Sequence, residues 1–179
     1  MKAVVVYESM YGNTHLIADA IAAGLRGSTD VVDVVVVSVD DADADALSDV
    51  DLLVVGGPTH VHGMSRANTR KAAVEAAEKS DGDLRMDPDA EGEGLRDWFD
   101  DLGPVAAHAA AFDTRMHGPA ALTGQASKGI AKRLRHHGCT LIADAESFLV
   151  TKENALDAGE ATHARDWGEQ LAAALASVH

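Results

Sequence analysis

The chain is poor in cysteine, in long apolar runs and in basic residues. Cys139 is the single cysteine among 179 residues, which excludes an intrachain disulfide and the cysteine-rich kinds of zinc or iron–sulfur site. No apolar run approaches the ~18 residues that cross a membrane. The N-terminal Met-Lys leads directly into an apolar segment without the pattern of a signal peptide. We therefore expect a cytoplasmic protein that is not inserted in a membrane.

Positive charge is scarce: 15 Lys and Arg residues stand against 29 Asp and Glu residues, for a formal net charge of −14. Nucleic acids and anionic membranes are themselves polyanions, and binding to either begins with the neutralisation of phosphate. We therefore expect neither as a partner. A partner protein with a basic docking surface suits this charge.

Apolar, β-rich segments alternate with alanine-rich helical segments along the whole chain. Strand patterns cover 3–7, 31–39, 51–55 and 105–112, with a fifth region at 140–143 and 147–150, and helical patterns cover 14–25, 66–79, 95–102, 124–137 and 160–176. This alternation predicts one α/β domain over residues 1–179, a doubly wound five-stranded parallel sheet with helices on both faces. Such sheets bind ligands at the carboxyl ends of their strands.

Residues 80–94 interrupt the alternation. They are rich in acidic residues and glycine, and Leu84 and Met86 are their only large apolar side chains. Burial of so little apolar surface does not offset the entropy lost on ordering a segment. We therefore predict an acidic, exposed insertion.

The segment after the first strand, 8–14, reads ESMYGNT. Ser9 and Thr14 supply hydroxyls, Gly12 permits a tight turn, and the N–H groups of the following helix point to the same place, which together favour a phosphate. The segment is neither a Walker A loop nor a Rossmann loop, and since it has no lysine it suits a monophosphate. The alternative interpretation is an ordinary helix start capped by Asn or Thr.

Three segments resemble the flavodoxin-like family. Residues 4–21, VVVYESMYGNTHLIADAI, are similar to its N-terminal signature, in which Ser/Thr-x-x-Gly-x-Thr holds the phosphate of FMN. Residues 51–64, DLLVVGGPTHVHGM, resemble its third strand and first flavin loop, and 110–117, AAFDTRMH, stand at the place of its second flavin loop. The resemblance implies the strand order 2-1-3-4-5, with FMN at the point where that order reverses.

The resemblance also implies which residues hold the cofactor. For the phosphate these are Ser9, Met10, Tyr11, Gly12, Asn13 and Thr14. For the two sides of the ring they are Pro58, Thr59, His60 and Gly63, and then Phe112, Asp113 and Thr114. No catalytic side chain is implied, because the flavin itself carries the redox chemistry. Asp113 is expected to cap its neighbours' N–H groups, with proton acceptance as the alternative.

The ring loops depart from the family pattern. Flavodoxins typically place a Trp and a Tyr against the flavin, whereas this chain offers His60 and His62 in the first loop and Met116 and His117 in the second. Loss of two stacking faces, at ~0.5–1.5 kcal/mol each, predicts flavin binding weaker by about one or two powers of ten. A metal at His60 and His62 lacks a third ligand nearby, so we expect no metal site.

The function implied by the resemblance is non-covalent binding of FMN and electron transfer to a basic redox partner. Two alternatives stay open. One is a flavin-dependent NAD(P)H:quinone-type oxidoreductase, which the 9–11 and 57–59 tripeptides favour, although no nicotinamide-binding segment is visible. The other is a degenerate module of the same fold that has lost its flavin, as the missing aromatic residues suggest.

The helical segment 124–137 concentrates positive charge in an otherwise acidic chain. Lys128, Lys132, Arg133 and Arg135 lie within eight successive positions. Cations are favoured near the C-terminus of a helix. We interpret them as a solvated helix face.

Overall fold

The computed structural model describes residues 1–31, 33–60, 63–80, 85–88, 90 and 92–178. The strands are β1 (Lys2–Tyr7), β2 (Asp33–Ser38), β3 (Leu52–His60), β4 (Gly63–Met64), β5 (His108–Met116), β6 (Thr140–Leu141) and β7 (Glu146–Val150). The helices are α1 (Asn13–Arg26), α2 (Ala67–Lys79), α3 (Leu95–Asp101), α4 (Ala120–Thr123), α5 (Ala126–His136) and α6 (Glu160–Val178), with a 3₁₀ turn η1 (Val39–Asp41). Of these elements, α4, β4 and η1 were not predicted.

The central sheet confirms the predicted doubly wound order. Its strands run β2-β1-β3-β5-β6, and β7 continues beside β5 where β6 has ended. The pairs among β1, β2, β3 and β5 are parallel, while β4 folds back on β3 as a short antiparallel hairpin. The fifth predicted strand therefore exists as two short strands along one edge of β5.

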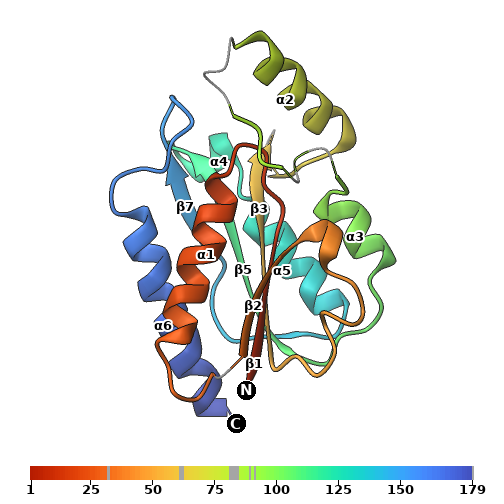
Figure 1. Cartoon of the computed structure of the whole chain (residues 1–179), viewed down its shortest axis with the longest axis vertical. Coiled ribbons are helices and arrows are strands. Elements are labelled where there is room, and N and C mark those ends of the chain that lie inside the picture. Colours follow the sequence, from red (N-terminus) through yellow and green to blue (C-terminus); the bar gives the residue numbers. More distant parts are fainter. Residues whose placement is uncertain (32, 61–62, 81–84, 89, 91, 179) are drawn as a thin grey trace.

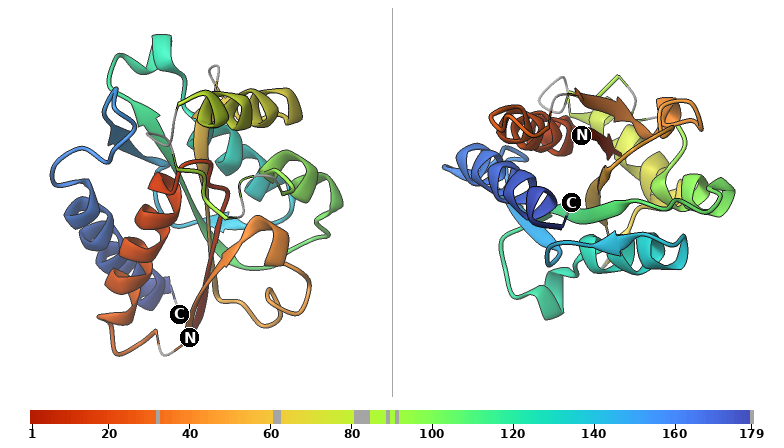
Figure 2. Two further views of the ribbon diagram at one scale, coloured as in Figure 1. Left: turned by 45° about the horizontal axis from the view of Figure 1, so that its top comes forward. Right: turned by 90° about the horizontal axis from the view of Figure 1, so that it is seen from below.

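Helices cover both faces of the sheet. On one face α1 and α6 lie side by side over a core that includes Ile21, Phe112 and Trp167, and on the other α3 and α5 cover a core that includes Phe99 and Ile130 (Figures 1 and 2). The helices supply Ile21, Phe99, Ile130 and Trp167 of these side chains, and β5 supplies Phe112. Figure 1 shows α2 beyond the carboxyl ends of β1 and β3, and both termini at the opposite end.

Strands β3 and β5 run further than the sequence pattern indicates. Their parallel pairing continues through Gly57 opposite Asp113 and Pro58 opposite Thr114. The two expected ring loops are therefore largely strand, ending at His60 and Met116. Pairing between strands holds these residues extended, and a pattern read from one segment alone does not include that contact.

The expectation of an exposed insertion over 80–94 is wrong at two described positions. Asp87 and Ala90 are only 6% and 3% exposed. Ala90 packs with Met10 and Ala73, and the Asp87 N–H donates to the Met10 carbonyl at 2.8 Å. Residues 81–84, 89 and 91 of that segment, and His62, lie outside the described residues. Few apolar side chains are enough to bury this part of the segment, because they pack against apolar residues of α2 and of the 8–14 loop.

No helix within the described ranges is long and apolar enough to cross a membrane.

Candidate functional site

The loop between β1 and α1 presents the open end of a helix. Gly12 is the N-cap residue of α1 and has a φ of +87°, a conformation that favours glycine. Ser9 Oγ accepts the Gly12 N–H at 3.1 Å and so closes the turn. Since glycine has no side chain, it provides no acceptor for the first N–H groups of the helix. Asn13 and Thr14 lie inside the helix, so the interpretation of this segment as an Asn- or Thr-capped helix start is wrong.

The polar side chains at the start of α1 point toward distant parts of the chain. Thr14 Oγ1 lies 2.8 Å from Thr114 Oγ1 on β5, in a buried contact. The Asn13 side-chain amide donates to the backbone carbonyl of Asn154 at 3.0 Å. Hydroxyls and an amide from three separate segments therefore meet beside the uncapped helix end.

A cavity of about 200 Å³ lies where these segments meet. Of the thirteen residues expected to hold the cofactor, it is lined by Met10, Tyr11, Asn13, Thr14, Pro58, Thr59, His60 and Thr114. Arg115, Met116, Val150 and Asn154 complete the lining. Residues from the 9–14 loop, from the end of β3 and from the end of β5 thus come together at one place.

The other five expected residues do not line this cavity. Ser9 and Gly12 shape the loop, and Gly63 lies on the far strand of the β3–β4 hairpin. Phe112 is wholly buried in the core under α1 and α6, against Phe148 and Trp167, so its side chain is not available to a ligand.

Asp113 acts as a helix cap. Its Oδ2 accepts from Thr59 Oγ1 at 3.0 Å and from the Ser127 N–H, in the first turn of α5, at 2.8 Å. The side chain is fully buried on the face of β5 opposite to Phe112. Asp113 thus caps N–H groups, as expected, but those of α5 and not those of its own neighbours, and this contact fixes α5 against the ends of β3 and β5.

Arg115 is the main feature of the cavity that the sequence interpretation missed. Its Nη1 donates to the Gly118 carbonyl at 2.9 Å and to Thr123 Oγ1 at 3.2 Å. Its Nε is buried and has no hydrogen-bond partner among the described residues. The position just after Thr114 was a usable signal, but the strand was expected to end at Phe112.

His60 lies at the edge of the same cavity. Burial lowers the pKa of His60 below its ordinary value, so the imidazole is neutral at pH 7. Its Nε2 is buried without a partner in the part of the chain that the structure describes. Among the described residues, His60 Nε2 and Arg115 Nε are therefore both buried without a partner, and both residues line the cavity.

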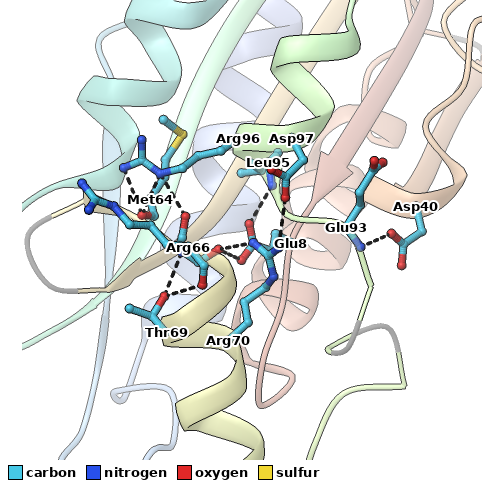
Figure 3. A network of polar contacts seen from close by, with 11 residues as sticks. Glu8, Asp40, Met64, Arg66, Thr69, Arg70, Glu93, Leu95, Arg96 and Asp97 are labelled. Carbon is cyan, nitrogen blue, oxygen red and sulfur yellow. Dashed lines mark hydrogen bonds and ion pairs between the residues drawn. The ribbon is translucent and has the colours of Figure 1, made fainter.

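A buried carboxylate holds the base of the site together (Figure 3). Glu8, at the end of β1, accepts from the Leu95 N–H at 2.9 Å and from the Ser65 hydroxyl. Arg70 reaches Ser65 Oγ at 3.4 Å and pairs with Asp97 at 3.0 Å. Burial raises the pKa of Glu8, while the bonds from Ser65 and Leu95 and the charge of Arg70 oppose that rise. Glu8 thus links β1, the segment after β4 and the start of α3.

Glu8→Gln is expected to change how stability depends on pH. Because the pKa of Glu8 in the folded protein lies above its ordinary value of 4.5, the native state keeps this proton to higher pH than the unfolded chain does. The free energy of unfolding of the wild type therefore falls, relative to the variant, as pH rises from about 4.5 through the folded pKa. Urea unfolding between about pH 4 and 8 measures this, with the exposed Glu75→Gln as control. Parallel profiles for wild type and Glu8→Gln would contradict it.

The residues present fit a flavin phosphate and part of a flavin ring. The uncapped start of α1 and the Thr14 hydroxyl provide donors for an anion, and Arg115 and His60 line the adjoining cavity. The volume of about 200 Å³ is below the 300–1,000 Å³ usual for ligand clefts. This cavity alone would therefore not enclose a whole flavin.

Comparison with known proteins gives a consistent result. The family model for flavodoxin matches residues 5–100, more than half of the chain. No curated protein sequence matches.

Solved structures match along almost the entire chain. A flavodoxin from the domain Archaea is 24% identical, with a TM-score of 0.65 and coverage of 98% of this chain and 99% of that one. Oxidised flavodoxin 1 from Bacillus cereus is 19% identical, with a TM-score of 0.63 and coverage of 99% and 98%. A WrbA-like flavodoxin from Agrobacterium tumefaciens is 20% identical, with a TM-score of 0.60 and coverage of 98% of each chain. By its family match, the chain belongs to the flavodoxin family of flavin-binding electron-transfer proteins.

Proposed function

We propose that this protein binds FMN without a covalent bond and passes electrons through it to a protein partner. The observation that carries the proposal is the uncapped N-terminus of α1 beside the buried hydroxyl of Thr14. A dianionic phosphate is stabilised by free N–H groups and by the positive end of a helix. The segment 9–14 contains no lysine, which suits one phosphate and not a polyphosphate.

In this proposal the residues divide between phosphate and ring. Asn13, Thr14 and the backbone of the 9–14 loop hold the phosphate, while Pro58, Thr59, His60 and Thr114 contact the ring. Bound FMN supplies the redox chemistry, and the protein sets its orientation and electrostatic environment. Ser9 and Asp113 act as positioning residues, the first through Gly12 and the second through α5.

The acidic surface suits a basic redox partner in the cytoplasm. With a net charge of −14, attraction to a basic surface accelerates encounter, and salt screens that attraction. The rate of electron transfer to a basic acceptor such as cytochrome c is therefore expected to fall as ionic strength rises.

A second candidate function, the NAD(P)H:quinone-type oxidoreductase, is favoured by Arg115. A cation lining the ring cavity stabilises negative charge on the reduced flavin, which suits an acceptor of a hydride. The acidic surface has the opposite effect, because it disfavours negative charge on the reduced flavin.

Titration of the purified protein with FMN tests the proposal. Saturable binding with a perturbed flavin spectrum supports it, and absence of binding contradicts it in favour of the degenerate module. Oxidation of NAD(P)H by the FMN-loaded protein with a quinone, at a rate above that of free FMN, identifies the oxidoreductase instead.

His60→Trp is expected to strengthen binding of the ring. The substitution adds a stacking face at the edge of the cavity, worth about 0.5–1.5 kcal/mol of binding free energy. Since FMN and riboflavin share the ring, both affinities should rise by the same factor, as measured by quenching of flavin fluorescence. If neither rises, His60 does not face the flavin.

A further inference from the structure

A large cavity with a distinct charge lies outside the candidate flavin site. Its volume is about 790 Å³, and it lies between α5, the β3–β4 hairpin and Arg96 of α3. It is lined by Lys132, Arg133, Arg135 and His136 of α5 as well as by Arg96, and none of the described residues that line it is acidic. We call this cavity the basic groove.

The charges of the basic groove are largely uncompensated. Arg133 pairs with Asp100 at 2.7 Å. Within the described ranges of the chain, no carboxylate pairs with Arg96, Lys132 or Arg135. Acidic residues outnumber Lys and Arg by 29 to 15 in this chain, yet the unpaired cations of the groove have no carboxylate of the described residues beside them and repel one another. An anion bound in the groove would relieve this repulsion.

Arg96 shows that the groove is more than the solvated face of one helix. Its Nε donates to the Ser65 carbonyl at 3.0 Å, and its Nη2 donates to the Met64 carbonyl at 3.2 Å (Figure 3). The backbone thus fixes a guanidinium from α3 opposite the cations of α5. The earlier interpretation of the α5 cations, as charges favoured by a helix C-terminus, does not account for this second wall.

Two glycines contribute to the floor of the groove. Gly129 lies inside α5, and a Cβ there would meet the Met64 methyl group at 3.5 Å. A Cβ on Gly63 would stand 3.7 Å from Arg96 Nη2. Without side chains at these positions, the groove keeps a volume within the 300–1,000 Å³ usual for small-ligand sites. A nucleotide-sized ligand matches that space.

We propose that the basic groove binds a nucleotide through its phosphate groups. Guanidinium groups form paired hydrogen bonds with phosphate, and a lysine adds a mobile point charge. The groove adjoins the candidate flavin site, because His60 lines the smaller cavity and its hairpin partner Gly63 lines the groove. The ligand is either a mononucleotide or the phosphate-bearing part of a pyridine dinucleotide. The inference is independent of FMN binding.

Isothermal titration of the purified protein with ATP and with NADPH tests the proposal. Wild type is expected to bind at least one of them, and Lys132→Gln/Arg135→Gln to bind it about 30-fold more weakly or worse, since two charge-assisted contacts are lost. Both side chains are exposed, so the fold is retained, as circular dichroism verifies. The control Lys71→Gln/Lys128→Gln changes the net charge equally, outside the groove, and is expected to bind like wild type.

A second pair of variants keeps the cations of the basic groove and changes its floor at Gly129. Gly129→Glu places a carboxylate in the groove and is expected to weaken binding more than the neutral Gly129→Gln, whereas a purely steric effect weakens both equally. Binding of ATP and NADPH alike supports a mononucleotide site, and binding of NADPH alone supports a dinucleotide site. The proposal is overturned if wild type binds neither probe, if the groove variants and the control bind alike, or if polyglutamate binds more tightly than both nucleotides.

Discussion

The double variant Ser9→Ala/Thr14→Ala is expected to bind FMN about 10- to 100-fold more weakly than wild type, corresponding to about 1–3 kcal/mol. The Thr14 hydroxyl is buried beside the uncapped start of α1, so its loss removes a donor from the place proposed for the phosphate. Ser9→Ala removes the oxygen that accepts a hydrogen bond from the Gly12 N–H, and this loosens the turn. Fluorescence titration with FMN measures the change.

Riboflavin is the matched ligand for this experiment, because it has the same ring and no phosphate. Its affinity is expected to stay nearly constant in the double variant. Thr14→Ser retains the hydroxyl and should bind FMN nearly as wild type does. Equal weakening toward FMN and riboflavin would show that the 9–14 loop does not recognise phosphate.

Gly168→Ala is expected to lower the free energy of unfolding by about 3 kcal/mol. An added Cβ at Gly168 would stand 2.2 Å from the Ile21 carbonyl oxygen, and one at Gly24 would stand 2.0 Å from the Arg165 carbonyl oxygen. These glycines let the backbones of α1 and α6 touch, and backbone atoms cannot move aside as a flexible side chain does. Inside an isolated helix the same change stabilises by about 1 kcal/mol, so the expected sign depends on the contact.

Urea unfolding measures the effect, which corresponds to a melting temperature lower by about 6–12 °C in a chain of this size. Gly24→Ala should behave in the same way. Gly103→Ala is the control, because a Cβ there meets no atom within 4 Å. Unchanged stability in Gly168→Ala would mean that α1 and α6 are not in backbone contact.

Features that depend only on residues close together in the sequence were predictable from the sequence alone. The strand over 3–7, the helix over 14–25 and the order of the sheet follow from local periodicity and from the resemblance to flavodoxins. The predicted helical segment 124–137 stops before Gly138, and the structure gives that residue a φ of +95°, which glycine adopts without strain. The 9–14 loop was found for the same reason, since all of its groups lie within six successive positions.

The tertiary structure decided everything that depends on which strands pair and which face a side chain takes. Phe112 and Asp113 are neighbours, yet one lies in the core under α1 and α6 and the other caps α5, because successive residues of a strand face opposite sides. The expected ring contact of Phe112 failed for this reason. Arg115 joins the cavity only because β5 continues beside β7.

The basic groove and the docking of Asp87 have the same kind of origin. Arg96 meets the cations of α5, and Asp87 meets Met10, across separations of more than 30 residues. Composition identified the acidic segment 80–94 and the basic helix as separate features. The sequence by itself determined the fold and singled out the 9–14 loop, because their signals are periodic or contiguous. Only the folded chain decided the shape and charge of the two cavities, because side chains from distant segments form them together.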